Sequence, residues 1–334
     1  LPYVFTTVSL CLVLFSFCCA AAAGVVGIVL GVAGLLSTAP LTLSLASNIP
    51  HLTFAIRLDP LAAFFVLTIS LVGVAASIYA SGYVEEFSGR VSVGLLGSLL
   101  NGFLLSMTLV VLADNGFFFL ILWEVMSLLS YVLVVTEHEK PGVREAGLFY
   151  LIMTHVGTAF IILTLLIFSQ ETGSFSFEAF RHPDQQLPEG LRSIAFFTAL
   201  IGFGAKAGIV PLHVWLPYAH PAAPSHISAL MSGVMIKTAI YGLIRVYFDF
   251  MGGVFPWWWG FTLLVLGTVS ALLGVMYALM EHDLKSLLAF HSVENIGIIL
   301  LGIGAGMIFH TYGLHELAAL GLLAGLYHTI NHAA

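Results

Sequence analysis

Two lysines lie inside segments that are otherwise apolar enough to cross a lipid bilayer. Lys206 lies within the segment 192–212, and Lys237 lies near the middle of the segment 227–248. An ammonium group at the bilayer centre costs about 2.5–3.5 kcal/mol on insertion scales, and such residues mark paths for ions or protons. The two lysines therefore indicate proton or ion transfer inside the membrane.

Other ionisable residues lie at the same depth in neighbouring apolar segments. They are Glu124, His155, His291, Glu294, His328 and His332. Twenty apolar residues offset one central charge but hardly two unpaired ones, so these groups are expected to face inward, toward partners or water. A carboxylate that approaches and leaves a buried lysine switches it between holding and releasing a proton. Histidines are suited to hand such protons onward.

Each of these residues also has a structural interpretation. Glu124 is alternatively a carboxylate that caps a neighbouring helix, and His155 is alternatively a packing histidine. His291 and Glu294, three residues apart, share a helix face and alternatively bond only each other. No metal site is predicted at His328 and His332, because no third ligand lies close to them in sequence. Arg245 and Lys285, near segment ends, are expected to be anchors at headgroup level.

Composition sets the fold class. The mean hydropathy is +1.05, with 60% hydrophobic and 8% charged residues, which excludes an ordinary soluble domain. We predict an all-α polytopic transmembrane bundle of ten or eleven spans. The run 4–36 is too long for one helix of about 20 residues, so it is predicted to hold one helix after a truncated one, or a tight hairpin. The other spans are expected at 60–80, 95–113, 116–136, 145–169, 192–212, 227–248, 257–280, 284–309 and 314–334.

Two local features interrupt this helical pattern. The segment 41–58 alternates weakly and predicts a short extramembrane β-hairpin. The helix that carries Lys206, the seventh, is predicted to break, because four prolines lie in the passage 211–224. Interrupted helices hold ion sites in transporters, and His213 in this passage is a further titratable candidate. His220 and His226 are either the polar mouth of a half-channel or solvated loop histidines.

The sequence predicts no redox cofactor, no metal and no nucleic acid. The net charge is −7, without a basic patch for nucleic acid. Cys11, Cys18 and Cys19 lie together in the first apolar run and are expected to be small buried hydrophobes. The stretch 202–207 matches the dinucleotide pattern G-x-G-x-x-A by chance, because it lies inside a membrane helix. Both chain ends fall in apolar runs and the chain lacks an initiator Met, which indicates a fragment of a longer protein.

Three stretches carry a resemblance to a known family. They are AKAGIVPLHVWLPYAHPAAPSHISALMSGVMIKTAIYGLIRV from Ala205, DLKSLLAFHSVENIGIILLG from Asp283 and LYHTINHA from Leu326. They resemble the antiporter-like membrane subunits of respiratory complex I and its relatives, in particular the branch of hydrogenase-4 component B and formate hydrogenlyase subunit 3. The resemblance covers most of the chain from about Asp59.

The resemblance implies roles and an architecture. Glu124 and Lys206 match the switching pair of the family, and Lys237 matches its central lysine. His328 and His332 match the histidines next in the relay. The family has two inverted five-helix repeats. This implies N-terminal helices with the hairpin at 1–94, a first repeat at 95–248 and an incomplete second repeat at 257–334.

The resemblance implies a proton-translocating subunit of a hydrogenase- or NADH-dehydrogenase-like complex, itself without redox chemistry. Its expected partners are the lipid bilayer and the other membrane and peripheral subunits, in a bacterial or archaeal plasma membrane. Two alternatives stay open. One is a subunit of a cation (Na⁺)/proton antiporter, and the other is an architectural anchor for a peripheral hydrogenase arm.

Overall fold

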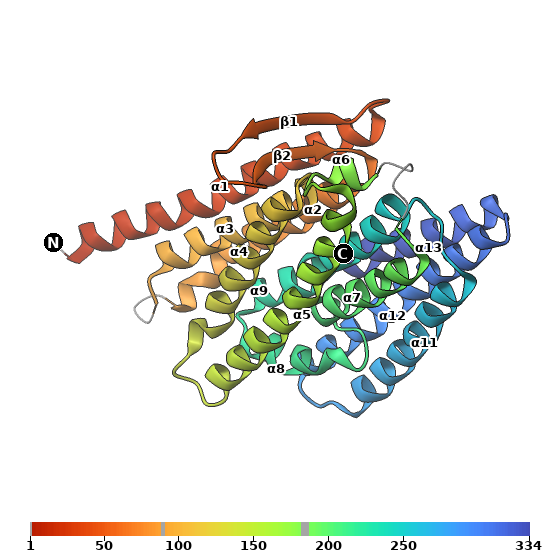
Figure 1. The fold of residues 1–334 in the computed structure, drawn as a ribbon. Coiled ribbons are helices and arrows are strands. Elements are labelled where there is room, and N and C mark those ends of the chain that lie inside the picture. Colours follow the sequence, from red (N-terminus) through yellow and green to blue (C-terminus); the bar gives the residue numbers. More distant parts are fainter. Residues whose placement is uncertain (1, 88–90, 182–186) are drawn as a thin grey trace.

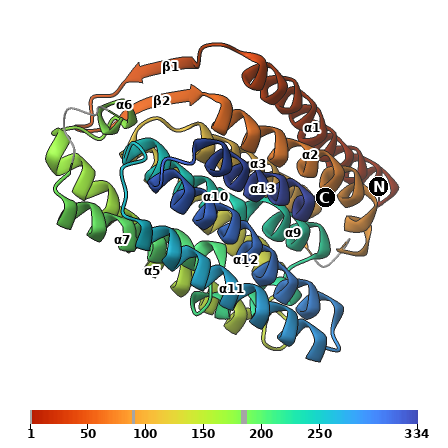
Figure 2. The ribbon, with the colours of Figure 1, turned by 90° about the vertical axis from the view of Figure 1, so that its right-hand side faces the viewer.

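The chain forms a bundle of long helices with one β-hairpin along its side (Figures 1 and 2). The computed structural model describes residues 2–87, 91–181 and 187–334, and only the backbone of residues 2–14, 85 and 86. Short 3₁₀ or π segments are labelled η. The helices and strands are α1 (Pro2–Leu36), β1 (Leu41–Ala46), β2 (Thr53–Leu58), α2 (Pro60–Tyr83), α3 (Val93–Leu112), α4 (Gly116–Val134), α5 (Val143–Thr172), α6 (Phe177–Phe180), α7 (Glu189–Ala207), α8 (Leu216–Ala222), α9 (Ser225–Leu230), α10 (Ile236–Ile244), α11 (Trp257–Met280), α12 (Leu284–Thr311) and α13 (His315–Ala333).

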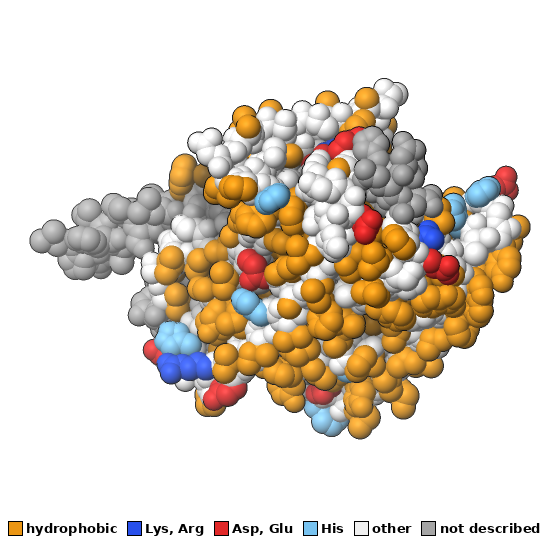
Figure 3. Space-filling view, viewed as in Figure 1, with side chains coloured by type: hydrophobic (Ala, Val, Ile, Leu, Met, Phe, Trp, Pro, Cys, Tyr) orange, Lys and Arg blue, Asp and Glu red, His pale blue; other side chains and the backbone are white. Residues whose placement is uncertain are grey.

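The bundle is that of a polytopic membrane protein. Within the described residues, nine helical segments are long and apolar enough to cross a membrane. The run 4–36 was predicted to hold one helix after a truncated one, or a tight hairpin, and this was wrong, because the run is one continuous helix of 35 residues. Helix α13 is also long but is not among these nine, because polar residues at both of its ends lower its mean hydropathy. With α13 the described residues hold ten long helical segments. Figure 3 shows that hydrophobic side chains cover most of the flank.

Small residues let α1 and α2 pack closely. A Cβ atom added at Gly31 would come within 2.8 Å of the Leu67 Cβ and 3.0 Å of the Ala63 carbonyl oxygen. Only glycine permits this approach of two helix backbones. Few of the described side chains of α1 are buried. Cys18 and Cys19 are exposed on this helix, and the prediction that they are buried was wrong. The side chain of Cys11 lies outside the described residues.

The predicted hairpin is present. Strands β1 and β2 pair antiparallel, with Leu41 opposite Leu58 and Ala46 opposite Thr53. Asp59 follows β2 directly and caps α2, because its side chain accepts a hydrogen bond from the Ala62 backbone N–H at 2.9 Å. The hairpin is therefore joined rigidly to the start of α2.

The helix that carries Lys206 is broken, as predicted. Helix α7 ends at Ala207, where Gly208 takes the left-handed conformation with φ of 80°, which glycine adopts without strain. A 3₁₀ turn, η4 (Leu212–Trp215), leads into the short helix α8. The Trp215 indole N–H donates to the Ala205 carbonyl at 2.8 Å. The break thus fixes the end of α7 next to Lys206.

The segment that carries Lys237 is irregular as well. Two π-helical segments, η5 (Met231–Met235) and η6 (Arg245–Phe250), flank α10. Every residue of α10 is buried, so this segment forms the centre of the bundle. π-Helical turns are rare and often occur at functional sites. The two lysines therefore lie at the two most irregular places of the core.

Candidate functional site

Lys206 is buried and held by hydroxyl groups. Its side chain is 1% exposed. The Nζ atom donates to the Ser127 Oγ at 3.0 Å and to the Tyr150 hydroxyl at 2.7 Å. Lys206 also lies in the last turn of α7, where the carbonyl end of the helix dipole favours a cation. The site accepts an ammonium group without giving it a counter-charge.

The Tyr150 hydroxyl orients this contact. It accepts from Lys206 and shares a 2.5 Å hydrogen bond with Ser130. The Ser130 hydroxyl in turn lies 2.8 Å from the Met126 carbonyl, which only accepts. Donation therefore runs from Lys206 through Tyr150 and Ser130 to the backbone. This chain fixes the position of the ammonium and ends at a carbonyl.

Glu124 contacts His155 in this structure, not Lys206. The Glu124 Oε2 lies 3.2 Å from the His155 Nε2, and no ion pair within 4.0 Å joins Glu124 to Lys206. The other carboxyl oxygen, Oε1, is buried and has no hydrogen-bond partner. The switching pair predicted from the sequence is thus open here, and its role stays a prediction.

Lys237 has no carboxylate within 4.0 Å among the described residues. It is 1% exposed, and its Nζ donates to the Ser232 carbonyl at 2.8 Å. The Ser232 hydroxyl lies 2.8 Å from the hydroxyl of Ser292 on α12. This second lysine therefore rests on a polar contact between the central segment and α12.

The histidines of α12 and α13 form a connected set. His291 and Glu294 bond each other at 2.5 Å, as the structural interpretation expected. Asn295 joins this pair to His328, because it donates to the His291 carbonyl at 2.6 Å and its Oδ1 lies 2.7 Å from the His328 Nε2. Asn295 thus links the α12 backbone at His291 to the side chain of His328 on α13.

Four further histidines have at least one ring nitrogen that is buried without a hydrogen-bond partner. They are His213, His220, His226 and His332. His220 is 2% exposed and its Nδ1 lies 3.3 Å from the Ser228 hydroxyl, while His226 is 1% exposed. The interpretation of His220 and His226 as solvated loop residues was therefore wrong, because the broken passage folds inward against the core.

Sequence reasoning missed the hydroxyl partners of Lys206. Ser127 follows Glu124 at three residues, on the same face of α4, and this spacing was a usable signal. Tyr150 carried no signal, because a tyrosine in an apolar helix is usually a packing residue. Among the described residues no three His, Cys, Asp or Glu side chains lie close enough to hold a metal ion.

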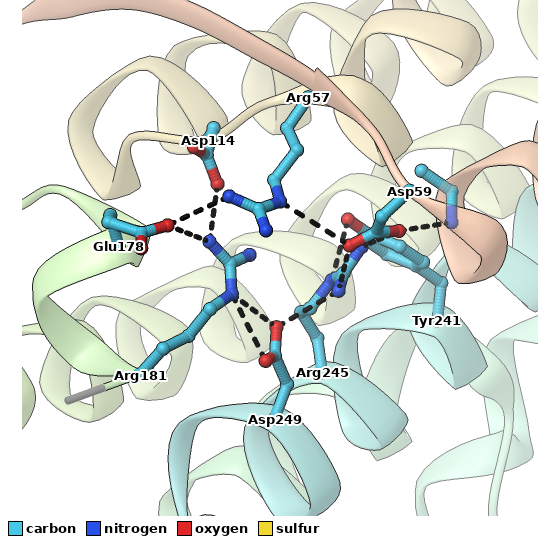
Figure 4. A network of polar contacts seen from close by, with 9 residues as sticks. Arg57, Asp59, Asp114, Glu178, Arg181, Tyr241, Arg245 and Asp249 are labelled. Atoms are coloured by element: carbon cyan, nitrogen blue, oxygen red, sulfur yellow. Dashed lines mark hydrogen bonds and ion pairs between the residues drawn. The ribbon is translucent and has the colours of Figure 1, made fainter. Parts of the chain in front are cut away.

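A separate network of ion pairs lies at the end of the bundle near the hairpin (Figure 4). Arg245 bonds Asp59 at 2.7 Å and Asp249 at 2.9 Å. Arg181 bonds Asp249 at 2.8 Å and Asp114 at 2.9 Å. The side chain of Arg245 is 7% exposed, because Asp59 at the start of α2 and Asp249, four residues further along the chain, both contact it. Its position at headgroup level stays a prediction.

The network changes the acidity of its members outside the spans. Burial raises the pKa of the Asp59 carboxyl, but the hydrogen bond and charge of Arg245 outweigh burial and the pKa lies below its usual value. At Asp114 burial outweighs Arg181, and the pKa is raised. Burial lowers the pKa of Arg181, but Asp249 and Asp114 raise it further above its usual value. Asp59 is thus the carboxylate that the network stabilises in its charged form.

Comparisons with known proteins place this fold. Residues 113–332 match the family described as NADH:quinone oxidoreductase/Mrp antiporter, TM. Residues 45–91 match the N-terminus of chain 5 of NADH-ubiquinone oxidoreductase (complex I). A solved Mrp complex from Dietzia sp. DQ12-45-1b has a TM-score of 0.74 at 24% identity, covering 96% of this chain and 60% of that one. That likeness shows the fold.

Curated relatives are closer in sequence. Hydrogenase-4 component B of Escherichia coli (strain K12) is 44% identical over 93% of this chain and 46% of its own length. Formate hydrogenlyase subunit 3 of the same strain is 34% identical over 84% of this chain and 44% of its own length. A probable K⁺/H⁺ antiporter subunit of Rhizobium meliloti (strain 1021) is 30% identical over 84% of this chain and 27% of its own. The chain thus spans less than half the length of these relatives, and it belongs to the NADH:quinone oxidoreductase/Mrp antiporter family of membrane subunits.

Proposed function

We propose that this chain relays protons through the membrane as a non-redox subunit of a hydrogenase- or NADH-dehydrogenase-like complex. The observation that carries the proposal is the pair of buried lysines, Lys206 and Lys237, which have hydroxyl and carbonyl partners and no carboxylate within 4.0 Å. A buried ammonium without a counter-charge is readily deprotonated. Such a lysine is suited to take up a proton and pass it on.

The proposed path uses the remaining groups in the order of their positions. Glu124 sets the charge state of Lys206 by approaching and leaving it. Lys237 takes the proton next, and His291, Glu294, His328 and His332 continue the route beside α12 and α13. His213 lies in the broken passage after Lys206, where it is placed to exchange protons with water. We also propose that residues 95–248 form the first five-helix repeat of the family and that residues 257–334 form an incomplete second one.

The wider setting is proposed from the relatives. Two of them are named as a component of hydrogenase-4 and a subunit of formate hydrogenlyase, so we propose other membrane and peripheral subunits of such a complex as partners. Electron transfer in those subunits would drive the relay. The proposed location is the plasma membrane of a bacterium or archaeon.

A second function is favoured by one specific relative. The probable K⁺/H⁺ antiporter subunit of Rhizobium meliloti supports a role in which this chain exchanges a cation for a proton. The same residues would serve it, with a metal cation moving against the proton. Dependence of proton movement on Na⁺ or K⁺, in the absence of an electron donor, separates this function from the first.

The test is proton uptake into inside-out vesicles that hold the protein in its complex. Lys206→Ala and Glu124→Gln are expected to lower proton uptake at least tenfold while the complex assembles. Lys140→Ala is the matched control, because Lys140 is a surface lysine with 61% of its side chain exposed. Unchanged uptake in Lys206→Ala would support the architectural anchor instead.

A further inference from the structure

The contact between Glu124 and His155 lies on the flank of the bundle and not in its interior. The side chain of Glu124 is 30% exposed and that of His155 is 49% exposed. Both lie inside spans, near the middle of α4 and α5. Hydrophobic side chains dominate this flank, with acidic and histidine side chains interrupting them (Figure 3). This polar contact is therefore open to the outside at a depth where the rest of the surface is apolar.

The hydrogen bonds of His155 fix where its protons lie. The Nδ1 atom is 2.8 Å from the Leu151 carbonyl. A carbonyl oxygen only accepts, so Nδ1 carries a hydrogen. The Nε2 atom then faces the Glu124 carboxyl group at 3.2 Å. If Nε2 and the carboxyl group were both deprotonated, two lone pairs would face each other.

The contact therefore requires one further proton. Either Nε2 carries it, as an imidazolium facing a carboxylate, or the carboxyl group carries it and donates to Nε2. We propose that His155 and Glu124 together hold one proton on this flank, and that this shared proton keeps Glu124 away from Lys206. The inference rests on the proposed function, because it assigns the step that loads the Glu124–Lys206 switch.

Loss of the shared proton moves Glu124 from His155 toward Lys206. The proton passes from the exposed His155 ring to an acceptor outside this chain, a water molecule or a carboxylate of an adjoining membrane subunit, and the neutral ring then presents a lone pair to the Glu124 carboxylate. Lys206 is the partner that remains for Glu124, since its Nζ donates to Ser127, three residues from Glu124 on α4. Glu124 turns to Lys206, which takes up a proton from the water reached through His213 and is then stabilised in its ammonium form. Reloading of the pair from outside withdraws Glu124, and Lys206 then releases its proton inward.

Other ionisable groups around the pair do not compete for it. Tyr150 on α5 is engaged with Lys206 and Ser130, and α3 has no ionisable residue. No cation on the remaining elements packed against α4 and α5 lies within 4.0 Å of Glu124. Besides Lys206 on α7, the ionisable groups on those elements are Tyr218 and His220 on α8, His226 on α9, His213 on η4, Arg57 on β2, Glu178 on α6, Glu189 and Arg192 on α7, and Glu137 on the turn η2 (Val135–Glu137).

The experiment follows the carboxyl group directly. Infrared difference spectra of the protein in its complex are recorded between pairs of pH values, and the Glu124 band is assigned by its loss in Glu124→Gln. In His155→Gln the pH midpoint of this band is expected to move by about one pH unit or more. A charged group a few ångströms from a carboxyl group typically causes a shift of this size. His282→Gln, an exposed histidine outside the spans, is the matched control and is expected to leave the midpoint unchanged.

A second variant guards against misfolding. In His155→Ala the same movement is expected, and added imidazole is expected to restore the original midpoint because the site is open to the outside. An unchanged midpoint in both His155 variants would overturn the inference. Because the band reports on Glu124 and not on transport, this result is independent of the outcome for Lys206→Ala, which tests the proposed function.

Discussion

The arginines at the end of the bundle and the lysines inside it differ in their partners. Arg57, Arg181 and Arg245 each lie within 4.0 Å of at least two carboxylates. Lys206 and Lys237 are more deeply buried, and yet the hydrogen bonds of their ammonium groups go to hydroxyls and a carbonyl. Near the hairpin, the positive charges of the arginines are neutralised by neighbouring carboxylates. In the core, the positive charges of the lysines have no such partners among the described residues.

The difference follows from what each side chain can do. Arginine stays protonated in proteins and its planar fork bonds two carboxylates at once, which suits a permanent joint. Arg245 in this way ties Asp59 at the start of α2 to Asp249 in η6. A lysine without a counter-charge loses its proton readily. Paired charges hold this fold together, and unpaired charges are left for proton transfer.

Lys237→Met gives the largest expected effect. Proton uptake by the complex is expected to fall at least tenfold, whereas the melting temperature of the protein in lipid should stay the same or rise. Methionine fills a similar volume and removes a buried group that prefers water. A large fall in melting temperature would show that Lys237 holds the fold, and the contrast with the arginines would fail.

Arg245→Met is expected to do the opposite. It leaves Asp59 and Asp249 without their shared cation, and removal of one partner of a buried ion pair costs about 3–5 kcal/mol. The melting temperature should fall strongly. Proton uptake per assembled complex is expected to stay near that of the wild type, measured at a temperature where the variant is folded.

Asp59→Asn tests the same joint through pH. The pKa of Asp59 lies below its unfolded value of 3.8, so its ionised form stabilises the fold above that pH and the benefit disappears as pH falls through the folded pKa. The variant is expected to be less stable than wild type at pH 6 and to approach it below about pH 4. Melting curves across this range check the result.

Asp114→Asn is the matched variant for that series. The pKa of Asp114 is raised by burial, so protonation favours the folded state, and wild type should gain relative to this variant as pH falls. If the stability difference between wild type and variant changed with pH in the same direction for both aspartates, Arg245 would not be the dominant partner of Asp59.

Tyr150→Phe has a smaller expected effect, inside the core. It removes one of two hydroxyls that accept from Lys206, and hydrogen bonds to charged groups contribute about 1.5–3 kcal/mol. The charged form of Lys206 should be less favoured, so proton uptake is expected to fall several-fold with little change in melting temperature. Tyr277→Phe, on the half-exposed surface of α11, should change neither quantity.

Arg57→Gln is expected to change little. Its closest partner, Glu178, is 55% exposed, and exposed ion pairs contribute about 0–1 kcal/mol. If Arg57→Gln lost as much stability as Arg245→Met, the exposure of an ion pair in this network would not predict how much that pair contributes to stability. Melting temperatures of the two variants, compared side by side, decide this.

The sequence alone determined the features that depend on local chemistry. Apolar runs of about twenty residues can only be helices in a bilayer, because every backbone polar group must be satisfied internally. The hairpin at 41–58 and the break after Ala207 followed from alternation, glycine and proline. The family followed from three stretches near the lysines. The length of α1 is the exception, because a helix can continue beyond the roughly twenty residues that a bilayer requires.

Only the tertiary structure decided which groups meet. Glu124 contacts His155 and not Lys206, and Arg245 bonds Asp59, which lies 186 residues away in the chain. Tyr150 became the partner of Lys206 because α5 packs against α7 in one particular rotation. Such pairings depend on how helices pack and on which rotamer each side chain takes. A single sequence shows the face a residue lies on, but not the neighbour that this face will meet.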